Sequence, residues 1–332
     1  MRISGVSSSW VTAGCIMLLL AGAALALESI TLQRPVGNTS SSADYGVLLF
    51  GRSAVHRYGP GPTPINIQSS DTPLTSVVAF AAGLAPIIGT RTPGTGATLT
   101  FNPPLVIPLK IWTLCVNQNC NGPFTDQFKE KLETFLFKAN EFLERERTGL
   151  VLGKAGTPGS DEWISNQTAN IPKRDQFKNF TTREDADDCA ADRLGVLTDQ
   201  MKDAGALNMY LVGRVDGEAG RGESCLEPDI SVIGAAALWH TMLHEVGHNL
   251  GLLHVDGRQI RHYVPSENLM HKASSERRFV SEGQTFLINF DSQSALKRVF
   301  SNLLPAPRPF RDCTNSQVEC PPLTTWIWDD QN

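Results

Sequence analysis

Apolar residues recur at helical spacing in two segments of the chain. The longer series is Phe128, Leu132, Phe135, Ala139 and Phe142. Residues three or four positions apart lie on one face of a helix, so this series predicts an amphipathic helix. Thr125 can cap the start of this helix, and Gly149 can end it. A shorter series predicts another helix, and its apolar residues are Ala190, Leu194, Leu197 and Met201.

Short β-rich runs alternate with these helices. They lie at 105–114, 150–152, 208–212 and 229–233. A last helix is expected over 292–303, with Leu296, Val299 and Leu303 facing inward. Strands that alternate with helices are typical of an α/β layer on a mostly parallel sheet. We therefore expect an α/β domain over 105–305, followed by a C-terminal tail over 306–332.

The segment 27–104 has a different pattern. It carries seven charged side chains and no lysine, and Gly, Pro, Ser and Thr cluster at 59–64 and 90–98. Such clusters are typical of turns and linkers. The pattern favours a pro-segment or a loosely built N-terminal extension. Extra strands of the main domain are an equally good interpretation.

The N-terminus resembles an export signal. Arg2 is the only charged residue before Glu28, and 11–26 is apolar and ends in Ala24-Leu25-Ala26. A short apolar core that ends in a small-x-small pattern is typical of a cleaved signal peptide, and it is shorter than the roughly 20 residues that span a bilayer. We expect 1–26 to be removed and the protein to be secreted, without a stable membrane anchor.

Removal of the signal changes the cysteine count. The chain has seven cysteines, and Cys15 leaves with the signal, so six remain. An even set in an exported chain predicts three disulfides. Pairing of neighbours closes the shortest loops, and it predicts the bridges Cys115–Cys120, Cys189–Cys225 and Cys313–Cys320. A zinc site built from these thiols is disfavoured because their spacings differ from the usual close pairs.

Charge narrows the class of partner. Lys plus Arg is 29 against 34 for Asp plus Glu, a net charge of −5, which argues against nucleic-acid binding. One cluster of acidic residues would suit Ca²⁺, although a solvated face explains it more simply. Its members are Asp185, Asp187, Asp188 and Asp192.

The most specific pattern is His-Glu-Val-Gly-His-Asn-Leu-Gly-Leu-Leu-His over 244–254. His244 and His248 lie one helical turn apart and can hold one metal ion. Glu245 projects beside them, where it can polarise a water in an open fourth position. Gly251 can end the helix in a left-handed conformation, which turns the chain back so that His254 completes a three-histidine site.

This pattern resembles that of the metzincin clan of zinc metallopeptidases. In that clan a methionine turn forms an apolar floor beneath the zinc, and Asn268-Leu269-Met270-His271 is similar to it. Weaker similarity extends upstream to 111–114, 139–141 and 208–212. The resemblance covers about 105–305. It implies a twisted, mostly parallel sheet whose edge strand lies over a zinc-binding active-site helix, with a smaller subdomain after the third histidine.

The resemblance also implies roles. His244, His248 and His254 would hold one catalytic Zn²⁺, Glu245 would be the general base, and Met270 would lie in the turn. A protein or peptide substrate would lie extended along an edge strand, expected at 229–234. The function that this resemblance implies is that of a secreted endopeptidase.

The sequence departs from individual subfamilies. Lys272 stands where astacins and serralysins carry a tyrosine, and Val255 stands where adamalysins carry an aspartate. No cysteine lies in 27–114, so the thiol switch of matrixins is absent. These departures leave the subfamily open.

Two other functions compete with the endopeptidase. One is a secreted binding or adhesion module with a structural zinc, and the other is a non-peptidase hydrolase that uses the same metal. Glu245 argues against the first, since a structural site needs no general base. Among the remaining histidines, His240 fits a place at the helix start better than a ligand role. His262 and His271 flank the motif and could touch substrate.

Overall fold

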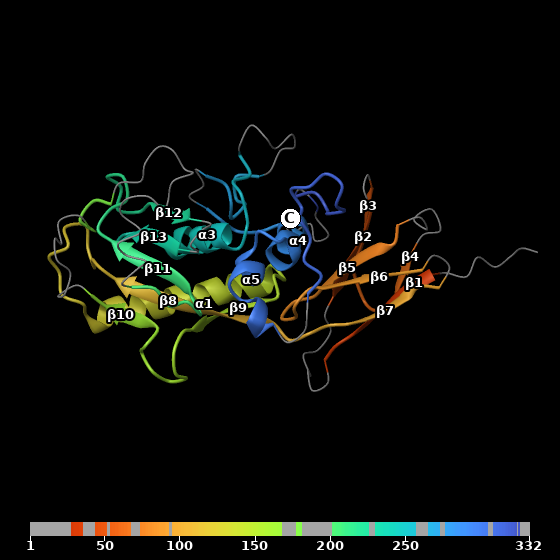
Figure 1. Cartoon of the computed structure of the whole chain (residues 1–332), viewed down its shortest axis with the longest axis horizontal. Coiled ribbons are helices and arrows are strands. Elements are labelled where there is room, and N and C mark those ends of the chain that lie inside the picture. Colours follow the sequence, from red (N-terminus) through yellow and green to blue (C-terminus); the bar gives the residue numbers. More distant parts are fainter. Residues whose placement is uncertain are drawn as a thin grey trace, which may run out of the picture.

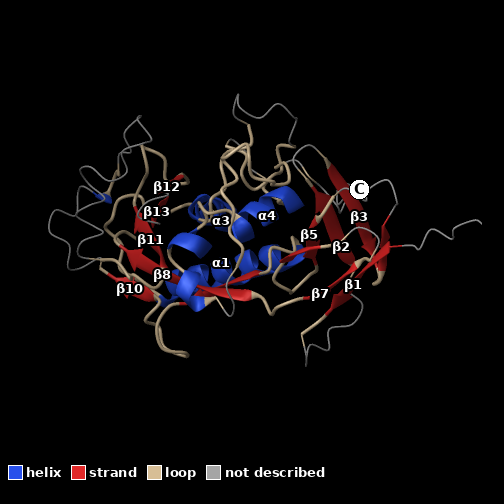
Figure 2. Ribbon diagram, turned by 45° about the vertical axis from the view of Figure 1, so that its right-hand side comes forward, coloured by secondary structure: helices blue, strands red, loops and turns tan. Residues whose placement is uncertain are grey.

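The computed structural model describes most of the chain beyond residue 27. The described residues are 28–35, 44–51, 54–67, 74–92, 95–167, 177–180, 201–225, 230–256, 265–272, 276–304, 308–323 and 325. Two groups of strands lie at opposite ends of the molecule, with helices between them (Figures 1 and 2). The predicted signal peptide and the acidic cluster lie outside the described residues. So does the helix expected over 190–201, except for its last residue, Met201.

A six-stranded sheet forms one end of the molecule. Its strands are β8 (Leu105–Thr113), β9 (Leu150–Lys154), β10 (Ile164–Asn166), β11 (Leu207–Val212), β12 (Gly222–Cys225) and β13 (Ile230–Gly234). The order is β10-β8-β11-β13-β12, and β9 pairs with the first half of β8. All pairings are parallel except that of β12 with β13. The predicted α/β class is therefore confirmed at this coarse level.

Two helices pack against this sheet. Helix α1 (Asp126–Arg145) is the predicted amphipathic helix, and the Thr125 hydroxyl accepts a hydrogen bond from the Phe128 N–H as its cap. Helix α3 (Trp239–Asn249) carries the histidine motif. Their buried faces join those of β8, β9 and β11 in one apolar core. Burial of these faces supplies the main stabilisation of the layer.

Gly149 does not end helix α1 as predicted, but lies in the turn that follows it. Helix α1 ends at Arg145, and Arg147 already has a positive φ of 55°. Gly149 lies in the following turn with a φ of 69°, where an added Cβ would be 2.3 Å from Cδ of Pro86. The glycine therefore lets the chain pass close to the N-terminal segment rather than ending the helix.

The C-terminal helices differ from the expected single helix over 292–303. Helix α5 (Ala295–Arg298) is short, and the 3-10 turn η3 (Ser301–Leu303) follows it. A longer helix, α4 (Glu282–Phe290), precedes them and was not predicted. It begins in a capping box in which Ser281 and Gln284 satisfy each other's backbone N–H groups. The Ser-x-x-Gln spacing was a usable signal for this start.

The N-terminal segment forms two small sheets. Their strands are β1 (Glu28–Gln33), β2 (Tyr45–Phe50), β3 (Val55–Gly61), β4 (Ile65–Ile67), β5 (Ser76–Phe80), β6 (Ile87–Thr90) and β7 (Ala97–Thr100). The sheet orders are β4-β1-β7 and β3-β2-β5-β6, and the two sheets share their own apolar core. The described part of 27–104 is thus neither loosely built nor paired with the six-stranded sheet. Its removal as a pro-segment stays a prediction.

Helix α4 joins the two ends of the molecule. Alternate side chains of β2 and β5 face away from the N-terminal core and pack on Phe286 and Phe290. The rings of Phe50 and Phe286 meet edge to face, with centroids 5.4 Å apart. Because both faces of β2 and β5 are covered, these strands are buried at every position and carry no charged residue.

Two of the three predicted disulfides are present. Cys115 is bonded to Cys120, and Cys313 is bonded to Cys320. Cys189 lies outside the described residues, so the Cys189–Cys225 bridge stays a prediction. Disulfides persist in oxidising compartments, which is consistent with an extracellular location. Within the part of the chain that the structure describes, no helix is long and apolar enough to cross a bilayer.

Candidate metal centre

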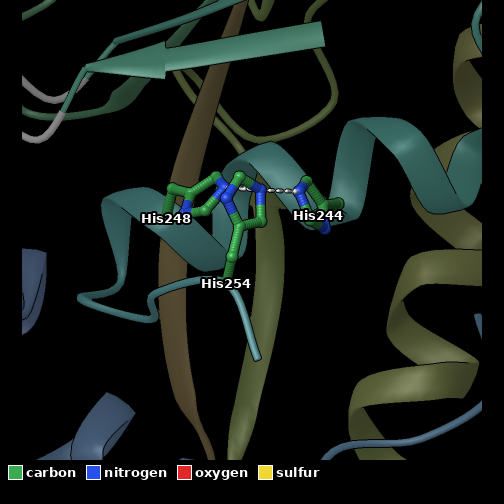
Figure 3. Close-up of side chains that lie close together, drawn as sticks. All are labelled: His244, His248 and His254. Carbon is green, nitrogen blue, oxygen red and sulfur yellow. Dashed lines mark hydrogen bonds between the residues drawn. The ribbon is translucent and has the colours of Figure 1, made fainter. Parts of the chain in front are cut away.

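Helix α3 and the turn after it bring three histidines together. His244 and His248 lie one turn apart on α3, and the helix ends at Asn249 (Figure 3). Gly251 has a φ of +88°, and its N–H donates to the His248 carbonyl at 2.9 Å. This left-handed residue reverses the chain, as predicted, and returns His254 to the two helical histidines.

The three side chains point their Nε2 atoms at one another. Nε2 of His254 lies 3.1 Å from that of His244 and 3.2 Å from that of His248. Two nitrogens about 2.05 Å from a tetrahedral zinc ion are about 3.3 Å apart, so the spacing fits one such ion. The three potential ligand atoms lie within 4.8 Å of one another. The predicted ligand set can therefore hold a metal ion.

Backbone carbonyls fix the orientation of two of these rings. Nδ1 of His244 lies 2.6 Å from the Leu269 carbonyl, and Nδ1 of His248 lies 2.7 Å from the Leu252 carbonyl. A proton on Nδ1 leaves the Nε2 lone pair free for a metal. Burial, which is the main cause, lowers the pKa of His244 to about 2 and that of His248 to about 4. Both rings are therefore neutral at pH 7, as ligation requires.

Met270 lies under the helix, where the resemblance places it. Its side chain is fully buried. A Cβ at Gly247 would stand 2.6 Å from the Met270 sulfur, so the glycine inside the motif leaves room for the methionine. The Asn268 side chain holds this turn, since its Oδ1 accepts from the Met270 N–H at 2.9 Å and its amide pairs with Gln284 of α4. The Gly247 contact was not foreseen from the sequence.

Glu245 is buried on the side of α3 that faces β12. The Ser224 hydroxyl donates a 2.8 Å hydrogen bond to its Oε2. Burial, only partly offset by this hydrogen bond, raises the pKa of Glu245 to about 8. A carboxyl group with a pKa near neutrality is well matched to proton transfer at physiological pH.

A chain of side chains continues from Glu245 into the sheet. Ser224 Oγ lies 3.1 Å from Ser231 Oγ, and Ser231 donates to Oδ1 of Asn249 at 2.8 Å. The chain ties β12, β13 and the end of α3 together. Sequence reasoning missed these residues, because serines on two strands give no local signal that one meets Glu245 and the other meets Asn249.

The edge of the sheet lies at β12 rather than at 229–234. The predicted edge was wrong because β13 is hydrogen-bonded to β11 on one side and to β12 on the other. Strand β12 runs antiparallel at the end of the order and contacts α3 directly. A continuous run of buried, mostly apolar residues, as in β13, is typical of a strand with neighbours on both sides.

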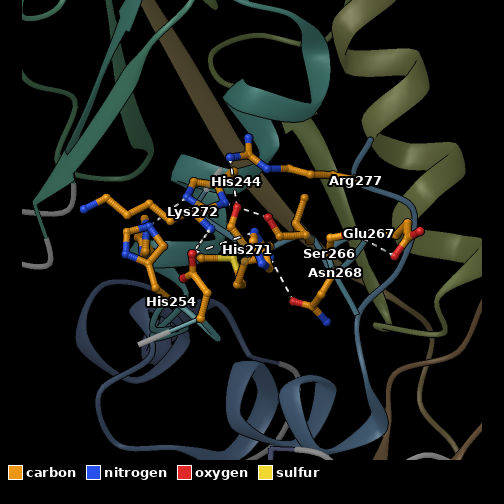
Figure 4. A network of polar contacts seen from close by, with 12 residues as sticks. His244, His254, Ser266, Glu267, Asn268, His271, Lys272 and Arg277 are labelled. Carbon is orange, nitrogen blue, oxygen red and sulfur yellow. Dashed lines mark hydrogen bonds and ion pairs between the residues drawn. The ribbon is translucent and has the colours of Figure 1, made fainter. Parts of the chain in front are cut away.

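His240 and His271 lie near the cluster without joining it. His240 is one turn before His244, and its backbone carbonyl lies near Arg277. Nδ1 of His271 is 3.7 Å from a carboxylate oxygen of Asp256 (Figure 4). His262 lies outside the described residues. The metal-binding cluster among the described residues thus contains the three predicted histidines and not His240.

Comparisons with known proteins do not assign a family. No protein-family model and no curated protein matches the sequence. Among solved structures, a chain from the "Structure of a chaperone-substrate complex" aligns with 66% of this chain at 15% identity and a TM-score of 0.35. This chain covers only 35% of that one. So slight a likeness carries no argument about function.

Proposed function

We propose that this protein is a secreted zinc-dependent endopeptidase with a metzincin-like catalytic domain. The observation that carries the proposal is the convergence of three Nε2 atoms at zinc spacing, with Glu245 on the same helix. The buried Met270 beneath that helix supports the metzincin comparison. The two disulfides support an extracellular site of action.

The residues present suit hydrolysis of a peptide bond. A zinc ion on the three histidines would supply Lewis acidity to a water and to the scissile carbonyl. Glu245 would take the proton from the attacking water and pass it to the leaving amine. Ser224 holds one carboxylate oxygen, which fixes the orientation of the carboxyl group for this transfer.

The substrate would bind as an added strand. Strand β12 ends the sheet order, so one of its edges has no partner strand among the described residues. A sheet edge offers backbone N–H and C=O groups to an extended peptide. Because β12 also supplies Ser224 beside Glu245, a peptide on this edge would lie next to the proposed general base.

The number of ligands favours catalysis over a structural role. A structural zinc site is usually closed by four protein ligands, whereas a catalytic one keeps a position open. Within the described residues the cluster contains three histidines and no fourth metal-binding side chain. A non-peptidase hydrolase would use the same groups, and cleavage of peptides separates the two.

The proposal predicts metal-dependent proteolysis. The purified secreted protein should bind about one zinc per chain and cleave a denatured protein, because three histidine ligands leave one position for water. A chelator should stop cleavage, and added zinc should restore it. Metal content by mass spectrometry and gel analysis of the cleavage test this. If zinc removal lowers only the melting temperature and no substrate is cleaved, the binding-module function replaces the endopeptidase.

The contact between Gly222 and Glu245 gives a second prediction. A Cβ at residue 222 would lie 2.6 Å from Cγ of Glu245, which is too close for both to keep their positions. Gly222→Ala should therefore displace the carboxylate and lower kcat/KM by roughly 10²-fold, while the zinc content stays unchanged. Peptide-cleavage kinetics and metal analysis measure the two effects.

Gly220→Ala is the matched control. It adds the same methyl group two residues away, where the structure leaves at least 4 Å of open space. Its cleavage rate should stay within about twofold of the unmutated protein. Equal activity of the two glycine variants would argue against the position assigned to Glu245.

A further inference from the structure

Arg277 is a buried cation near the histidine cluster that makes no direct ion pair among the described residues, although the charges of Glu245 and Asp256 act on it from a distance. Arg277 is only 8% exposed, and its Nε atom is buried without a hydrogen-bond partner among the described residues. Its other two nitrogens make long contacts with backbone carbonyls, at 3.5 Å to His240 and 3.3 Å to His271. A buried charge with so little compensation is costly, so it calls for an explanation.

The position of Arg277 relates it to the proposed active site. Figure 4 shows its side chain reaching from its loop to lie beside His244. Its two carbonyl contacts place it between the first turn of α3 and the residue after Met270. The guanidinium is thus held beside the His244 end of the cluster.

A second buried nitrogen near Arg277 also makes no hydrogen bond within the described part of the chain. Nδ1 of His240 is also buried without a partner among the described residues. His240 and Arg277, which are in contact through the His240 carbonyl, therefore each carry a buried nitrogen that makes no hydrogen bond among the described residues. A planar guanidinium binds a carboxylate through two parallel hydrogen bonds, which is stronger than its present contacts with neutral carbonyls.

We propose that Arg277 is a substrate-binding residue that receives a carboxylate of the peptide close to the scissile bond. This inference rests on the proposed peptidase function and adds a substrate class to it. The carboxylate belongs either to an Asp or Glu side chain or to the free C-terminus of the peptide. Both sources present the same planar anion, and the experiment has an arm for each.

The test uses zinc-binding probes, so that it does not depend on catalysis. Short peptide hydroxamates anchor on the zinc of the loaded protein, and calorimetry gives their Kd. Matched probes carry Glu or Gln beside the hydroxamate, with an amidated end. A second pair carries no acidic side chain and ends in a free acid or an amide. At least one pair should favour the carboxylate by about tenfold or more.

Variants of Arg277 assign the preference to this residue. Arg277→Gln should abolish the difference within the preferred pair, and Arg277→Lys should keep part of it because the charge remains. Arg308→Gln is the control, since Arg308 is a half-buried arginine on another part of the molecule, beside Asn289 and Phe290 of α4. It should leave the preference unchanged. Melting temperatures of all variants show whether they fold.

The outcomes separate the inference from the proposed function. If the unmutated protein cleaves peptides but binds the carboxylate and amide probes equally, the carboxylate site is wrong and the peptidase stands. A preference that survives in Arg277→Gln also overturns the assignment. If nothing is cleaved but the preference is present and depends on Arg277, the site stands and the peptidase function fails. No binding by any probe overturns both.

Discussion

The Glu245→Ala protein should cleave peptides on the order of 10³-fold more slowly than the unmutated protein while keeping its zinc. A positioned general base contributes roughly 10²–10⁴-fold to such reactions. The zinc should remain because the three histidines of the cluster do not include Glu245. Two of their rings are also held by backbone carbonyls rather than by this carboxylate. The rate constant kcat, measured beside the zinc content of the same sample, tests both expectations.

A neighbouring carboxylate supplies the control for this prediction. Glu223 lies on β12 next to Ser224, but its carboxylate pairs with Arg221 at 3.3 Å rather than with a group on α3. Glu223→Ala should change kcat by only a few-fold, because a partly exposed ion pair contributes little. A Glu245→Ala protein that cleaves as fast as the Glu223→Ala protein would show that Glu245 is not the base.

The largest expected effect on stability is at Phe286. Its side chain is fully buried, and its ring meets those of Phe50 and Phe290 with centroids 5.4 and 5.2 Å away. Removing a buried phenylalanine costs transfer free energy and leaves a cavity, so Phe286→Ala should lower the free energy of unfolding by about 3–5 kcal/mol. Urea unfolding at a fixed zinc concentration measures the change.

Phe137 offers the matched substitution. It lies on helix α1 but is 62% exposed, so Phe137→Ala should change the free energy of unfolding by less than about 0.5 kcal/mol. If Phe286→Ala costs no more than Phe137→Ala, the contact between α4 and the N-terminal sheet does not stabilise the protein.

The sequence predicted the metal cluster well because its spacing is local. His244 and His248 are related by one helical turn, and the glycine needed for the return of His254 stands in the motif itself. The contacts of Ser224, Gly222 and Gly247 could not be predicted in this way. Each joins residues from separate elements, and only the paired positions of β12, α3 and the Met270 turn bring them together.

The elements that were mispredicted have identifiable physical reasons. Helix α4 is buried on nearly all sides, and several of its buried residues are polar, so its sequence does not show the apolar stripe and solvent-facing polar side on which helical periodicity depends. The strands of 27–104 are short and interrupted by Gly and Pro, so the sequence left a loosely built extension and extra strands as equal alternatives. The uninterrupted buried pattern of 230–234 indicates an interior strand, which agrees with the position of β13 between β11 and the edge strand β12.

Helix α4 contacts both halves of the molecule. One side of it presents Gln284 to Asn268, which shapes the turn under the histidines, and the other presents Phe286 to the N-terminal sheet. A chain shortened to begin near residue 105 would expose this aromatic surface to water and loosen the support of the metal site. The N-terminal strands thus support the half of the molecule that carries the histidine motif, and they lie at the opposite end from the six-stranded sheet, with α4 between them and α3 (Figure 1).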